Sequence, residues 1–194
     1  MSTKDGAKSQ DFITAALSKG TKQTEGAKAH GVFTIECFDA QGNLKWAQDI
    51  PNLVVNVGLQ DMNTKYFAGS SYTAAWYIGL YGAAASNTPA AADTSASHAG
   101  WTEVTAYSQA TRVAVTFGTA TTADPSVISN SASPAAFSIN GTTTVGGAFL
   151  ISNSTKGGTT GTLFSASDFQ SPGDRSVILG DTVNVTYTFN LDAA

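Results

Sequence analysis

The end of the chain carries the pattern that most limits how it can fold. From Thr182 to Leu191, apolar side chains alternate with polar ones. The apolar positions are Val183, Val185, Tyr187, Phe189 and Leu191. Because successive side chains of a strand point to opposite faces of a sheet, this pattern predicts a half-buried antiparallel strand with one wet face. We therefore expect Val185 and Tyr187 to point into a core and Thr186 to point away from it.

Shorter segments rich in β-branched and aromatic residues precede this strand, and turn residues separate them. The run Asp-Ala-Gln-Gly-Asn at 39–43 joins the first two segments into a hairpin. The predicted strands are 32–38, 44–48, 76–81, 102–106, 112–117, 136–140, 145–151 and 161–164. Many short strands favour a mainly β fold, which is an antiparallel sandwich, a jelly roll or a barrel-like domain. The long stretches 82–100 and 119–133 are expected to be loops.

A helical period interrupts the β pattern and predicts one packed helix at about 57–67. The apolar stripe consists of Val55, Leu59, Met62 and Tyr66. Asn56 is expected to cap the start of the helix, and Gly69 is expected to close its end. A stripe of this kind usually belongs to a core, so we expect it to pack on the sheet.

The first thirty residues are polar, with lysines set among Gly, Ser, Thr and Gln. We expect a flexible N-terminal arm over 1–30 and a single β-rich domain over 31–194. Residues 11–17 form the one apolar-faced helical turn of the arm, which makes Phe12, Ile13 and Leu17 candidate partner-binding residues. Seven residues are too few for a stable isolated helix. The arm is therefore either a disordered tail or a segment that orders on a neighbouring subunit.

Charged residues make up 12% of the 194 residues, about half the roughly 25% usual in soluble domains, and the net charge is −4. Such a surface does not match phosphate or anionic lipid, so we expect no nucleic-acid partner and no membrane partner. The N-terminus lacks an apolar signal-peptide core, which favours folding in a cytoplasm. The single cysteine, Cys37, allows no intramolecular disulfide and is expected to be a buried small hydrophobe.

No residue pattern points to catalysis. His98 has Asp93 and Glu103 nearby, but the chain has no Gly-x-Ser-x-Gly elbow, so we expect a loop histidine bonded to a backbone carbonyl. Glu103 and Arg112 are expected to form an ion pair between two strands. The sequence thus predicts no catalytic residues, no cofactor and no metal site.

Two weaker possibilities stay open. Asp168, Asp174 and Asp181 would form a hard-cation site only if the fold brought them together. A second set of aromatic residues either belongs to the core, which their place in strands favours, or forms a stacking platform for sugar. These aromatic residues are Trp76, Tyr77, Tyr81 and Trp101.

The order of the motifs between Asn52 and Phe189 resembles a known family. The motifs are Asn52–Leu59, Trp76–Leu80, Asp93–Thr94, Ser97–Glu103, Tyr107–Arg112, Phe137–Asn140, Gly147–Leu150, Gly157–Phe164 and Gly180–Tyr187. This series is similar to small virion structural proteins of tailed bacteriophages, in particular head decoration (cement) proteins. The resemblance implies a β-rich fold in symmetric copies, a trimer or dimer, with the major capsid protein as partner. It also implies synthesis in the host cytoplasm and a place on the head surface.

Three functions follow as hypotheses. The first is a non-enzymatic decoration protein that binds and stabilises the head shell. The second is a tail or head-fibre component, which includes an adhesin that binds host glycan through exposed aromatic residues. An enzyme such as a glycan hydrolase is disfavoured, because it needs two carboxylates in one cleft and the acidic residues are dispersed along the chain.

Overall fold

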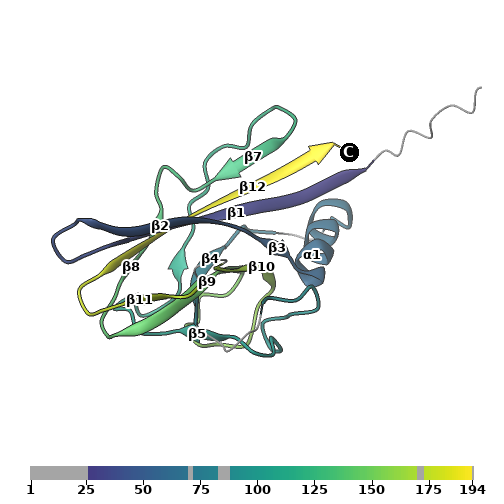
Figure 1. Cartoon of the computed structure of the whole chain (residues 1–194). Coiled ribbons are helices and arrows are strands. Elements are labelled where there is room, and N and C mark those ends of the chain that lie inside the picture. The colour runs from purple at the N-terminus through teal and green to yellow at the C-terminus, as the bar shows by residue number, and fades with distance from the viewer. Residues whose placement is uncertain (1–25, 70–71, 83–87, 170–172, 194) are drawn as a thin grey trace, which may run out of the picture.

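A computed structural model of the chain describes residues 26–69, 72–82, 88–169 and 173–193, which form two antiparallel sheets with one helix (Figure 1). The first sheet has the order β2-β1-β12-β7, and β8 also pairs with β12. Its strands are β1 (Ala27–Phe38), β2 (Leu44–Pro51), β7 (Ser126–Ser129), β8 (Ala135–Ser138) and β12 (Thr182–Ala193). The predicted mainly β sandwich with one packed helix is confirmed.

The second sheet has the order β3-β10-β9-β4-β5, with β11 pairing with β9 and β6 pairing with β4. Its strands are β3 (Leu53–Val54), β4 (Tyr77–Gly82), β5 (Thr102–Val104), β6 (Val113–Ala114), β9 (Thr143–Ile151), β10 (Leu163–Asp168) and β11 (Arg175–Val177). β9 contains a bulge: Tyr81 pairs with Gly147 and Gly82 pairs with Val145, so Gly146 has no partner residue on β4.

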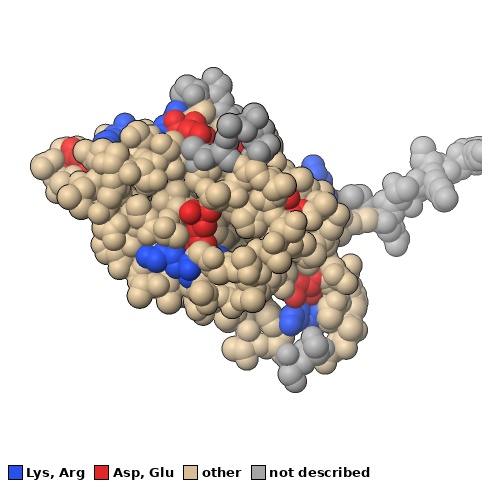
Figure 2. Space-filling view, turned by 90° about the horizontal axis from the view of Figure 1, so that it is seen from below, with Lys and Arg blue, Asp and Glu red and all other residues tan. Residues whose placement is uncertain are grey.

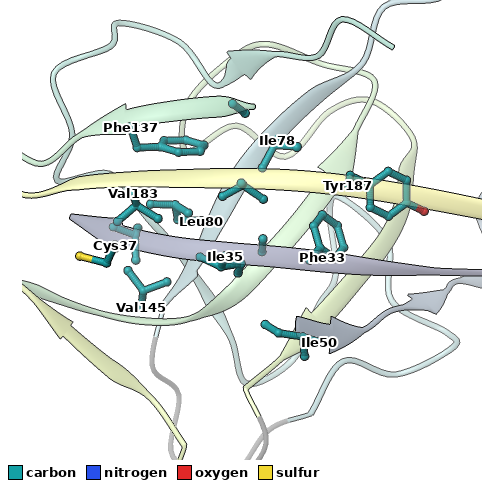
Figure 3. Close-up of a cluster of buried hydrophobic side chains, with 14 of the residues drawn as sticks. Phe33, Ile35, Cys37, Ile50, Ile78, Leu80, Phe137, Val145, Val183 and Tyr187 are labelled. Carbon is teal, nitrogen blue, oxygen red and sulfur yellow. The ribbon is translucent and has the colours of Figure 1, made fainter. Parts of the chain in front are cut away.

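The core lies between the sheets and is built on the alternation of β1 and β12 (Figure 3). In register, Phe33 faces Tyr187 and Ile35 faces Val185, and all four side chains are buried. Thr186 is half-buried on the other face, as the alternation predicts. Each large apolar side chain buried in this way contributes roughly 1.5–3 kcal/mol to folding.

The first strand begins earlier than the sequence predicts. β1 starts at Ala27 instead of residue 32, and its first residues pair with the last residues of β12, Ala27 opposite Ala193. Residues 27–30, predicted to belong to the arm, are therefore part of the sheet, because β12 supplies a backbone partner that the local sequence does not reveal. Residues 1–25, with Phe12, Ile13 and Leu17, lie outside the described residues.

β7 is a further departure, since it lies in the stretch predicted to be a polar loop. Its four residues pair with Thr188–Leu191 of β12, so the ladder of an existing strand fixes a short edge strand that has little β signal of its own.

The helix, α1 (Asn56–Phe67), begins one residue before the predicted range. Asn56 does not cap it: Val55 is the N-cap residue, and the Asn56 N–H donates to the Ala91 carbonyl at 2.8 Å. Gly69, at φ +65°, adopts the left-handed conformation expected of a residue that closes a helix. The element is confirmed and its cap is corrected.

The face that α1 presents to the sheet also differs from the prediction. Gly58 is the fully buried residue of the helix, and a Cβ there would lie within 2.4 Å of the Phe164 carbonyl oxygen. The first turn lies against β10 at Gly58, whereas the later part of the helix is not enclosed. Leu59, Tyr66 and Phe67 are 41%, 82% and 78% exposed. The predicted core stripe is therefore wrong at Leu59 and Tyr66 and holds at Val55 and Met62.

Candidate functional site

A buried ion pair joins the second sheet to a neighbouring loop. Arg112, just before β6, donates from Nε to Glu103 Oε1 at 3.0 Å and from Nη2 to Oε2 at 2.8 Å. The two side chains are 2% and 7% exposed. The predicted pair exists, but it does not link paired strands. β5 and β6 both pair with β4, at opposite ends of that strand.

Backbone groups complete what we call the Arg112 network. The guanidinium donates to the carbonyls of Asn153 and Gly158, at 3.0 and 2.8 Å, and the Gly157 N–H donates to Glu103 Oε2 at 2.8 Å. Both charged groups thus find several internal partners, which is the condition under which a buried ion pair is tolerated. The network ties loop 153–158 to the edge of the second sheet.

His98 and Trp101 lie beside this network. His98 Nδ1 is 3.0 Å from the Trp101 carbonyl oxygen, which confirms the predicted loop histidine, and its ring stacks on the indole at 3.9 Å between centroids. The Trp101 indole N–H donates to Asp93 Oδ2 at 3.0 Å, and the Ala90 N–H donates to the same oxygen at 3.0 Å. These bonds fasten the segment that leads into β5.

A hollow of about 260 Å³ lies between His98, Trp101, Arg112 and loop 157–159. General acid–base chemistry needs a titratable group within reach of a substrate proton. Here the carboxylate of Glu103 bonds to the guanidinium and a backbone N–H, and His98 bonds to a carbonyl. The arrangement therefore fits a structural fastening better than a catalytic centre.

The three aspartates considered as cation ligands do not form one site. Asp181 bonds to Lys45 Nζ and accepts from the Ile178 N–H at 2.9 Å. Asp168 lies elsewhere, where burial and the nearby charge of Asp174 raise the pKa of its carboxyl. Within the described residues, no three His, Cys, Asp or Glu side chains are grouped to hold a metal ion.

The four aromatic residues considered as a sugar platform are divided between the two hydrophobic clusters, with Tyr77, Tyr81 and Trp101 in one and Trp76 in the other. Tyr81 and Trp101 are 1% and 3% exposed and pack on each other at 5.1 Å between ring centroids. Trp76 instead packs on Phe164 at 5.4 Å, against the other hydrophobic cluster. The prediction that these side chains are mostly core is confirmed.

An apolar groove runs beside α1, at the end of the molecule where the described chain begins. It has a volume of about 540 Å³. Its apolar lining, which defines the α1 groove, comprises Ala27, Met62, Tyr66, Phe67, Tyr72, Trp76, Phe164 and Leu191. Tyr66 and Phe67 form an edge-to-face pair at 4.8 Å. Large exposed rings gathered in one hollow are typical of an interaction site.

A second apolar surface, which we call the hairpin end, lies where the β1–β2 turn meets the β11–β12 turn. Leu44, Ile178 and Leu179 are 56%, 50% and 69% exposed there. The ion pair of Lys45 with the buried Asp181 holds the two turns together. At the β1–β2 turn, Asp39 accepts bonds from the backbone N–H groups of Gln41 and Asn43, at 2.9 and 2.8 Å.

Cys37 lies beneath the hairpin end and is fully buried, as predicted. Burial, with a further contribution from the Asp181 charge, raises the pKa of its thiol from 9.0 to about 11. The thiolate is the reactive form of cysteine, so Cys37 is expected to be inert near neutral pH.

Charged side chains are sparse on the face shown in Figure 2, where Lys, Arg, Asp and Glu form small separate groups on an otherwise uncharged surface. In the described part of the chain, α1 is not long and apolar enough to cross a membrane.

Comparison with known proteins adds no assignment: the chain matches no family model, no curated protein and no solved structure. The candidate sites therefore rest on geometry. Sequence reasoning missed both exposed apolar surfaces, because it assigned the α1 stripe to the core and gave no role to Leu44, Ile178 and Leu179. The signal that was available for α1 is Gly58, which stands on the same helix face one turn after Val55.

Proposed function

We propose that this protein is a non-enzymatic structural component of a bacteriophage virion, a decoration protein that binds the major capsid protein and stabilises the head shell. The observation that carries this proposal is the presence of two exposed apolar surfaces, the α1 groove and the hairpin end, on a sandwich with few charges. A protein that bridges other subunits needs more than one contact surface. The motif order between Asn52 and Phe189, which resembles decoration proteins, supplies the biological setting.

The hairpin end suits a contact with a rigid lattice. Its three exposed apolar side chains stand on turns fixed by Lys45–Asp181 and by the Asp39 bonds, so little conformational entropy is lost when they are covered. Each contact is small, but a capsid presents many identical sites. A ligand that binds only the assembled shell lowers the free energy of that shell at every occupied site.

The experiment compares particles with and without the protein. Particles that lack it should release DNA at a lower temperature or at lower salt, while they still adsorb to host cells normally. Heat stability that stays intact together with lost adsorption would instead establish a fibre or adhesin role. A gel of purified virions, calibrated by mass, adds the copy number, with hundreds of copies expected per particle.

A matched pair of variants locates the contact. Leu179→Asp places a charge at the hairpin end, and Thr122→Asp places one at an exposed loop position elsewhere. Added back to particles that lack the protein, Thr122→Asp should restore heat stability and Leu179→Asp should not. Equal restoration by both variants would remove the hairpin end from the proposal.

A further inference from the structure

The α1 groove is open in the described part of the chain, and the first described strand begins at its rim. Ala27, the first residue of β1, lines the groove together with Leu191 of β12. Figure 1 shows the start of β1 and the end of β12 side by side near α1. Met62, Tyr66 and Phe67 of the helix also line the groove. Trp76 and Phe164 complete its apolar lining, and their ring centroids lie 5.4 Å apart. The groove therefore offers aromatic and aliphatic contacts to an apolar segment.

The sequence that precedes Ala27 contains one such segment. In residues 1–25 the sole run with a large apolar face is 12–17, Phe-Ile-Thr-Ala-Ala-Leu. The nine residues 18–26 separate it from Ala27. Nine extended residues span at most about 30 Å, at roughly 3.3–3.6 Å each, so the segment reaches a second molecule that approaches this end.

The helix face outside the groove indicates which molecule supplies the segment. Tyr66 and Phe67 are 82% and 78% exposed, and Leu59 is 41% exposed. A short segment in the groove would cover the groove side of the two rings and leave their other side and Leu59 in water. A second copy of the chain would cover both, because its arm would fill the groove while its helix met the rings.

We propose that residues 12–17 of one copy dock in the α1 groove of a second copy, and that the exchange is reciprocal. The chain that precedes Ala27 joins the described structure at the rim of the groove. A two-fold axis at this end would place each arm at the groove of the other copy, with identical surfaces in contact. Phe12, Ile13 and Leu17 are the anchors, and Trp76 and Phe164 receive them. This assembly forms without a capsid, so its failure and the failure of the proposed function are separate results.

The test uses disulfide formation between two populations of the full-length protein. One carries Leu17→Cys and the other carries Met62→Cys. The native Cys37 is fully buried and is not expected to form a disulfide under these conditions. After mixing and mild oxidation, the expected product is a covalent dimer that contains one chain of each kind. Thr3→Cys, in the polar part of the same arm, replaces Leu17→Cys in the control and should give little of this dimer.

Two results overturn the proposal. One is an equal yield of mixed dimer with Leu17→Cys and Thr3→Cys. The other is a double variant, Leu17→Cys with Met62→Cys, that closes within single chains in preference to linking two, because the groove would then hold the arm of its own molecule.

A second measurement needs no cysteine. By sedimentation equilibrium, Phe12→Asp should weaken self-association by on the order of tenfold or more, since a buried aromatic anchor is lost. Thr14→Asp, off the apolar face of the same turn, should leave self-association unchanged. Equal weakening by both variants, or a wild type that is monomeric at high concentration, refutes arm exchange.

Discussion

The hollow beside the Arg112 network and the α1 groove indent the same sandwich, but they are built in opposite ways. The first holds about 260 Å³ and is lined by bonded polar groups together with Phe149, Ile151 and Leu163, and Arg112 and Glu103 at its edge are almost wholly buried. The second holds about 540 Å³ among aromatic rings, two of which are more than three-quarters exposed. The polar groups of the first hollow have their bonding partners inside the chain, whereas two rings of the α1 groove are exposed to solvent.

The difference shows how each region is expected to respond to change. A charge in the Arg112 network has its partners inside the chain, so removing a partner damages the fold. The exposed rings of the α1 groove, Tyr66 and Phe67, make few contacts inside the chain, so altering them is expected to affect association and to leave folding nearly intact. Stability and self-association measured on the same variants therefore test whether the two regions are distinct.

The largest effect is expected for Arg112→Leu. The substitution leaves Glu103 buried without its cation, and breaking a buried pair in this way costs about 3–5 kcal/mol. Urea unfolding measures the loss. Arg175→Leu is the matched control: Arg175 is half-exposed and donates to the Gln48 amide oxygen at 2.7 Å and the Gly173 carbonyl at 2.9 Å. A loss for Arg112→Leu no greater than that of the control would show that the network is not a structural fastening.

A smaller loss, about 1–3 kcal/mol, is expected for Gly58→Ala, because the new Cβ would meet the Phe164 carbonyl oxygen at 2.4 Å and force α1 away from β10. Alanine normally stabilises a helix interior relative to glycine by about 1 kcal/mol, so the sign of the effect identifies the close contact. Gly118→Ala, where the nearest atom lies at 3.5 Å, is the control in the same denaturant titration. Stabilisation by Gly58→Ala would mean that this contact does not hold the groove in shape.

The two regions also differ in how far the sequence predicted them. The alternation from Val183 to Tyr187 predicted a buried face correctly, because a period of two leaves only one set of side chains for the core. The ion pair of Glu103 with Arg112 was expected, but its carbonyl partners at Asn153 and Gly158 come from a loop about forty residues away, and local patterns carry no such information.

The α1 groove escaped prediction for a different reason. Helical spacing shows which side chains share a face, but it does not show how far the helix lies from the sheet along its length. The contact at Gly58 sets that distance at one end, and Tyr66 and Phe67 at the other end stay outside the core. The start of β1 was misplaced in a similar way, since Ala27 pairs with Ala193, 166 positions later in the chain.

The smallest effect on folding is expected for Phe67→Asp. Phe67 is 78% exposed. At low protein concentration, the free energy of unfolding of the Phe67→Asp variant should therefore differ from that of the wild type by less than about 0.5 kcal/mol. Self-association raises apparent stability by mass action, so the melting temperature of the wild type should rise with protein concentration and that of Phe67→Asp should not. Leu179→Asp introduces the same charge at the hairpin end and should keep the concentration dependence. If Phe67→Asp instead costs more than about 1 kcal/mol at the lowest concentration, the ring is covered within its own chain, and the groove belongs with the Arg112 network as part of the fold.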